Sequence, residues 1–207
     1  GGLSTAEVDQ LLIDLAAAGG TWTGNKRVYL KGTNAARSTA SNTAVSTLLS
    51  KGVSVQTNYE FNFDVVSTQT ISGQFSTVSG QTITVYWGDG TSNTYTGTDQ
   101  TYTKDYGSAG NRTVRMTNAD QLTKFTMTQA SANITFDLAA LPRGVTYLLC
   151  QGSNTVSGNL SSLPAGLTYF YCAGAGSFTG NLSSLPVGLT FFVCGPNTLT
   201  GSISSLP

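Results

Sequence analysis

The C-terminal third of the sequence repeats one phrase, and this repetition constrains the fold more than any other feature. Gly-Asn-Leu-Ser-Ser-Leu-Pro-Ala-Gly-Leu begins at Gly158, a near-identical copy begins at Gly180, and a third begins at Gly201. A period of about 22 residues is typical of solenoids, whose coils bury their apolar side chains only by stacking on their neighbours. We therefore expect stacked coils that present a surface rather than a pocket.

The repeat extends towards the N-terminus when its apolar positions are aligned. Three apolar residues spaced i, i+3 and i+5 recur at nearly the same interval, starting at Leu122, Val145, Leu167 and Leu189. The last copy continues as Asn197, Leu199, Gly201 and Ile203. Each copy should form one short parallel strand, then a turn and a 3₁₀ or irregular return through Ser-Ser-Leu-Pro. The sequence ends inside a copy, so we expect a truncated array.

Shifts in composition divide the chain into three modules. Residues 1–57 combine helical periodicity with two short alternating stretches, which predicts a small α/β cap of helices and strands that is like a degenerate repeat pair. Residues 58–119 hold many short alternating stretches separated by turn signals, which predicts a β-sandwich. Residues 120–207 hold the repeats.

These motifs resemble known families. The repeat phrase is similar to the leucine-rich repeats of bacterial surface proteins and of phage tail adhesins. The stretch Tyr86-Trp-Gly-Asp-Gly-Thr91, with Tyr106 and Thr113-Val-Arg-Met116, is similar to a PKD-like immunoglobulin-type module. The resemblance implies a mainly β fold in which an N-terminal cap and a PKD/Ig-like sandwich precede a leucine-rich-repeat solenoid. It also implies an extracellular protein that is secreted or sits on a cell or virion surface.

Composition argues against several classes of function. The chain has 10 acidic and 10 basic residues and no histidine. Histidine is the commonest general base and metal ligand, so its absence and the lack of a carboxylate pair argue against an enzyme. Without a basic cluster the chain lacks the electrostatic attraction that dominates nucleic-acid binding. No apolar run approaches the ~20 residues of a membrane span, so we expect no membrane insertion. From the lack of histidine and of a carboxylate pair we expect no catalytic residues and no cofactor.

Cysteine and aspartate give no clear metal site. Cys150, Cys172 and Cys194 recur once per copy at an inward apolar position, so we expect a core ladder of free thiols. A disulfide between neighbouring strands is the alternative, but in-register side chains point the same way and three cysteines cannot all pair. Asp89 in Gly-Asp-Gly could bind calcium, although a lone aspartate there is more typical of a turn.

The outward positions of the repeat strands are the candidate binding site. Two columns should form on this face, the first Tyr147, Tyr169 and Phe191 and the second Leu149, Tyr171 and Val193. An exposed patch of this size usually marks an interaction site. The alternative is cross-strand packing that merely stiffens the sheet.

The distribution of charge suggests two functions for this face. Arg143 is the last charged residue of the chain, so the whole stretch 144–207 is uncharged. An uncharged surface rich in Thr, Ser, Asn, Gly and Tyr suits recognition of a cell-surface glycan or protein, which predicts a non-enzymatic adhesin segment. It also suits lateral packing between copies, because surfaces without charge tend to associate. The second hypothesis is therefore a structural subunit of an extracellular filament.

Overall fold

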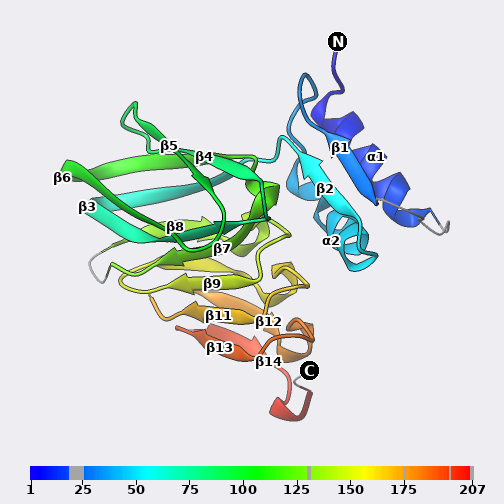
Figure 1. Cartoon of the computed structure of the whole chain (residues 1–207). Coiled ribbons are helices and arrows are strands. Elements are labelled where there is room, and N and C mark those ends of the chain that lie inside the picture. The colour runs from blue at the N-terminus through cyan, green and yellow to red at the C-terminus, as the bar shows by residue number, and fades with distance from the viewer. Residues whose placement is uncertain (19–25, 130–131, 175, 196, 206–207) are drawn as a thin grey trace.

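The computed structural model describes residues 1–18, 26–129, 132–174, 176–195 and 197–205, with the backbone alone for Asn197 and Ser205. A small unit of helices and two strands lies beside the upper part of a large β body, from which pairs of short strands descend towards the C-terminus (Figure 1).

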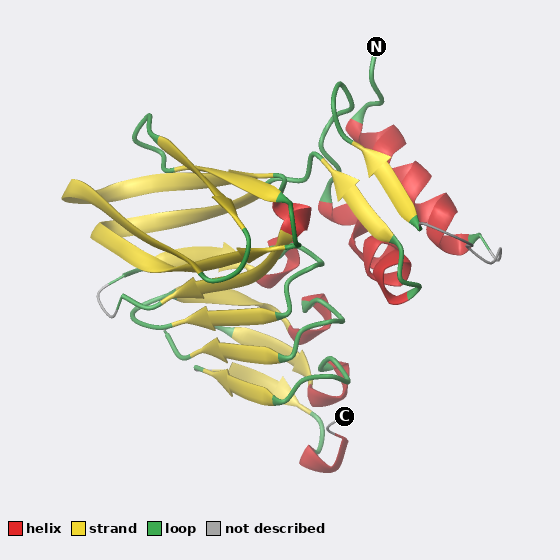
Figure 2. Cartoon of the chain, viewed as in Figure 1, coloured by secondary structure: helices red, strands yellow, loops and turns green. Residues whose placement is uncertain are grey.

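The N-terminal unit is a layer of helices on a two-stranded sheet (Figure 2). Its elements are α1 (Thr5–Ala17), β1 (Arg27–Leu30), the 3₁₀ helix η1 (Thr39–Ser41), α2 (Asn42–Ser50) and β2 (Ser54–Thr57). Ser4 and Glu7 form a capping box at the start of α1, where the Ser4 N–H donates to Glu7 Oε2 at 2.8 Å. The two strands are parallel, and Val28 and Val55 pack with Leu12 and Leu48 from the helices.

The β body contains twelve strands in one mixed sheet. The strands are β3 (Phe61–Thr77), β4 (Thr82–Tyr86), β5 (Ser92–Thr96), β6 (Gln100–Thr117), β7 (Leu122–Met127), β8 (Ile134–Asp137), β9 (Tyr147–Cys150), β10 (Thr155–Asn159), β11 (Tyr169–Cys172), β12 (Phe178–Asn181), β13 (Phe191–Cys194) and β14 (Asn197–Thr200). Five further 3₁₀ helices follow: η2 (Ala119–Gln121), η3 (Leu138–Ala140), η4 (Leu160–Ser162), η5 (Leu182–Ser184) and η6 (Ile203–Ser205).

The long strand β3 holds this sheet together. One half of β3 pairs with β7, with Gly73 opposite Met127, and the other half pairs with β8, with Asp64 opposite Thr135. β6 runs antiparallel to β3 along nearly all of its length. The pairing shifts between Val65 and Thr70, and such irregularities bend a strand. The bent β3 therefore starts two stacks of strands at once.

The predicted fold class, a sandwich followed by a leucine-rich-repeat solenoid, is wrong. The middle strands and the repeat strands belong to one mixed sheet, with the order β13-β11-β9-β7-β3-β8-β10-β12-β14, which curls into a half-barrel. Each repeat copy adds two strands to this sheet rather than one. The second strand was missed because its residues, such as Thr155–Asn159, are rich in turn-forming Ser, Gly and Asn.

The recurring phrase sets the register of the repeat strands. Tyr147, Tyr169 and Phe191 are paired neighbours on β9, β11 and β13, all parallel. The Asn-Leu-Ser-Ser part of the phrase starts η4 and η5, because the Asn159 and Asn181 side chains accept hydrogen bonds from the N–H groups of Ser161 and Ser183, both at 2.9 Å. Every coil therefore turns at the same place, and the side chains stack in rows.

One hydrophobic core runs through the whole β body. It begins with the aromatic cluster of Phe61, Phe75 and Phe125 inside the curl of the sheet and continues downwards through Leu148 and Phe170. All five side chains are fully buried. The middle and repeat regions thus share apolar contacts as well as a sheet.

Candidate binding face

The two outward columns are only partly exposed. Phe191 shows 41% of its surface, whereas Tyr147 and Tyr169 above it are half-buried. The second column, made of Leu149, Tyr171 and Val193, is half-buried throughout. We define these six residues as the ladder face.

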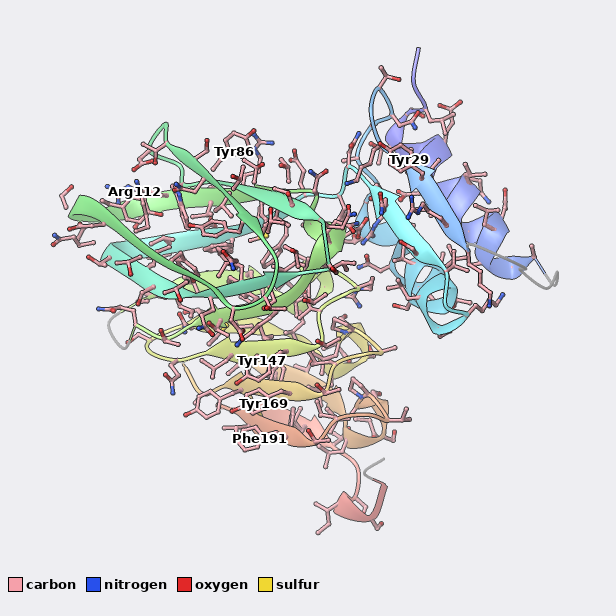
Figure 3. All side chains as sticks on the ribbon, in the orientation of Figure 1. Tyr29, Tyr86, Arg112, Tyr147, Tyr169 and Phe191 are labelled. Carbon is pink, nitrogen blue, oxygen red and sulfur yellow. The ribbon has the colours of Figure 1, made fainter. Side chains whose placement is uncertain are left out.

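The three rings of the first column stack face to face. The Tyr147 and Tyr169 ring centroids are 4.2 Å apart with an angle of 6° between the planes, and Tyr169 and Phe191 are 4.5 Å apart at 4° (Figure 3). The facing sides of neighbouring rings therefore cover one another, so Tyr169 is covered on both faces, and the ring edges and the tyrosine hydroxyls contribute to the surface. Partial burial and then the adjacent Tyr169 hydroxyl raise the pKa of Tyr147.

A charged group ends the column at its upper end. The Lys124 Nζ lies 5.0 Å from the Tyr147 ring centroid and forms an ion pair with Asp99 Oδ1 at 2.7 Å. It also donates to Gln74 Oε1 at 2.9 Å. The hydrogen bond and charge of Lys124 lower the pKa of Asp99. No pattern in the sequence linked these residues, although Lys124 occupies the repeat position of Tyr147.

A column of threonines lies beside the rings. The exposed Thr146, Thr168 and Thr190 side chains each donate to the main-chain carbonyl of the coil above, at 3.2, 3.0 and 2.9 Å. These hydroxyls tie successive coils together, and each oxygen can still accept a hydrogen bond. Below Lys124, this side of the ladder face is thus polar and uncharged.

The three cysteines point into the core of the coils. Cys150 and Cys172 are buried and Cys194 is half-buried, and they lie opposite one another on β9, β11 and β13 without forming a disulfide among the described residues. Burial raises the pKa of Cys172 well above its usual range. Such a thiol is a poor nucleophile, because the thiolate is the reactive form.

Asp89 occupies a hairpin turn. Its Oδ1 accepts from the Thr91 N–H at 3.0 Å, and its Oδ2 pairs with Lys104 Nζ at 2.6 Å. These contacts account for the aspartate without a metal. Within the described ranges, no three His, Cys, Asp or Glu side chains gather as metal ligands. No helix in the described part of the chain has the length and apolar character needed to span a bilayer.

A groove that we did not predict lies between the N-terminal unit and the coils. It consists of two hollows of about 450 and 410 Å³ that share Ser46, Arg143 and Ala165. One feature of the sequence could have indicated this groove. Arg143 is charged, whereas the aligned positions in the next two copies of the repeat hold the apolar residues Ala165 and Val187.

Comparison with protein-family models, curated proteins and solved structures found no match for this chain. The resemblance of the middle region to PKD-like modules therefore stays a prediction.

Proposed function

We propose that this chain is a non-enzymatic binding module that acts outside the cell or on a virion, and that its ladder face contacts a partner protein. The observation that carries the proposal is the partly exposed stack of Tyr147, Tyr169 and Phe191. The face on which this stack lies carries no charged side chain below Lys124. Aromatic side chains give much contact area for little loss of conformational entropy, and they are enriched at protein interfaces.

The stacking geometry favours a protein over a sugar as the partner of these rings. A pyranose ring binds to the flat face of an aromatic side chain, but both faces of the Tyr169 ring are covered by Tyr147 and Phe191 at 4.2 and 4.5 Å. The edges that remain suit the side chains of a complementary protein surface, and the hydroxyls of Tyr147 and Tyr169 can form hydrogen bonds at the rim.

Removing the rings tests this proposal. The double variant Tyr169→Ala/Tyr171→Ala should bind at least tenfold more weakly to its targets on an array of cell-surface proteins. The matched control is Tyr29→Ala/Tyr86→Ala, which removes two tyrosines that are 63% and 39% exposed outside the ladder face. Both variants are first checked for an unchanged thermal unfolding transition. Equal binding by both variants would contradict the proposal, and binding to a parallel glycan array alone would replace protein with glycan as the partner class.

Self-association is a second candidate, favoured by the uncharged surface of the coils. Residues 144–207 carry no charged side chain, and Val187 and Ile203 among them are 86% and 80% exposed. Surfaces without charge tend to associate. If the coils join copies, light scattering from the chain should rise steeply with concentration, and Val193→Lys on β13 should suppress the rise. A monomer at every concentration would exclude this candidate.

A further inference from the structure

The groove between the N-terminal unit and the coils has one apolar and one polar half. The larger hollow, about 450 Å³, is lined chiefly by Leu49, Val53, Val55 and Val78. The smaller hollow, about 410 Å³, is lined by hydroxyl and amide side chains that include Thr43, Asn42, Ser161 and Ser162. Their combined size lies within the range of small-molecule sites, which are mostly apolar and carry a few polar groups that orient the ligand.

Arg143 lies where the two hollows meet. It is only 6% exposed, and its guanidinium group donates four hydrogen bonds to carbonyl oxygens, two to Leu141 and one each to Leu138 and Ser162. A guanidinium group has five N–H donors, so these bonds leave one hydrogen, on Nη1, for a ligand. No carboxylate of the described residues forms an ion pair with Arg143.

The buried carboxylates of this region are already engaged. Asp120 pairs with Arg37 Nη2 at 2.7 Å, and its other oxygen accepts from Thr57. Asp9 accepts from the Ser38 N–H at 3.0 Å and from the Ser41 hydroxyl at 2.6 Å. Arg143 therefore carries a buried charge that touches only carbonyl oxygens, with the more distant Asp120 carboxylate partly offsetting it, and burial lowers its pKa to about 10. A ligand carboxylate would complete the compensation of this charge.

We propose that this groove binds a small carboxylate ligand with an apolar body. The carboxylate lies at Arg143 among the hydroxyl groups of Thr43 and Ser161, and the apolar body fills the hollow beside Leu49 and Val55. This site is separate from the ladder face and does not depend on the function proposed for it.

The repeat itself supports a role beyond linking coils. Arg143 aligns with Ala165 and Val187 in the following copies, and both of those coils form their 3₁₀ helix and strand without an arginine. A guanidinium group is therefore not needed to close a coil of this kind. The arginine occurs instead at the groove, where it lines both hollows together with Ser46 of α2.

Two soluble probes of the same shape test the proposal. Isothermal titration calorimetry with the full chain compares 4-phenylbutyrate with 4-phenyl-1-butanol, which differ in the carboxylate. We expect the acid to bind at least tenfold more tightly than the alcohol, since a charge-assisted contact with a buried arginine is a strong one. Arg143→Met should reduce the affinity for the acid to that for the alcohol.

A second pair of variants keeps the test independent of the stability of Arg143→Met. Ala165→Trp fills the shared part of the groove from an exposed position and should abolish binding of both probes. Val187→Trp makes the same change one coil lower, at a residue that does not line the groove, and should leave binding unchanged. Equal affinity for acid and alcohol, no binding at millimolar concentration, or unaltered binding by Ala165→Trp would each overturn the proposal.

Discussion

The repeated coils and the junction with the N-terminal unit are held together by opposite kinds of contact. Within the coils, rows of like side chains such as Phe170 on Phe192 pack at 5.3 Å between ring centroids. At the junction, the buried pair of Arg37 and Asp120 joins the two units, and the Asn42 side chain donates to the Ala139 carbonyl at 2.8 Å.

The difference lies in what each kind of contact specifies. A row of apolar side chains fixes the spacing of the coils but is the same in every copy, so stability depends on how many neighbours each coil has. A buried ion pair contributes little net stability against an apolar alternative, but in some proteins it specifies one arrangement of its partners. We therefore expect the junction to fix the orientation in which the groove around Arg143 exists.

The largest effect should follow from breaking the junction. Asp120→Ala leaves the Arg37 guanidinium buried without its carboxylate, and we expect it to lower the free energy of unfolding by about 4 kcal/mol. Urea denaturation measures the loss. Asp99→Ala is the control, because it removes an ion pair whose aspartate is 62% exposed, and it should cost far less stability than Asp120→Ala.

A double variant at Arg37 and Asp120 separates the effect of charge on stability from the effect of packing. Arg37→Met/Asp120→Leu should recover most of the loss, since apolar side chains of similar volume often replace a buried ion pair without cost. Equal stability of Asp120→Ala and Asp99→Ala would show that the junction is not held in the way described.

The next largest effect should distinguish an inner coil from the last one. Phe170 is fully buried between two coils, whereas Phe192 is half-buried on the last described strand of its stack. Phe170→Ala creates a cavity and should cost about 3 kcal/mol, while Phe192→Ala should cost about half as much. Urea denaturation of both variants gives the comparison. Equal losses would mean that the lower edge is covered in solution, as self-association would require.

The repeat made one part of the fold predictable. A constant period brings the same residue type to the same position in each coil, which is why the parallel register of Cys150, Cys172 and Cys194 could be expected. The period did not predict the second strand of each copy. Thr155–Asn159 has few apolar residues, and it becomes a strand because a neighbouring copy supplies its hydrogen-bond partners.

Structural features that occur only once in the molecule could not be predicted from sequence patterns. The bend of β3 includes Ser67 with φ 49°, a left-handed conformation that the sequence does not mark with a glycine. Arg37 and Asp120 are 83 positions apart, and no local pattern relates them. The candidate ladder face could be named from the sequence because it is repeated, whereas the groove could not because it arises where two unlike regions meet.

The smallest effect should be the loss of stability at low pH in the turn that contains Asp89. The hydrogen bond from Lys104, followed by that from Thr91, lowers the pKa of Asp89. A carboxylate whose pKa is lowered on folding stabilises the fold above its unfolded pKa, about 3.9, and this contribution is lost as the pH falls towards the folded value. Asp89→Asn should therefore be less stable than the parent chain at pH 6, by less than about 1 kcal/mol because the turn is exposed.

The difference in the free energy of unfolding between the parent chain and Asp89→Asn, here called the gap, should narrow at pH 2, where the parent carboxylate begins to take up its proton. Urea denaturation at both pH values measures the gap, and Lys104→Gln, which removes the main cause of the shift, should weaken the pH dependence in the same way. The coils below Arg143 carry no Asp or Glu side chain. Their packing should therefore respond little to acid, and Phe170→Ala should cost about as much at pH 2 as at pH 6. A gap for Asp89→Asn that stays constant across this range would contradict the assignment of the turn as the acid-sensitive contact.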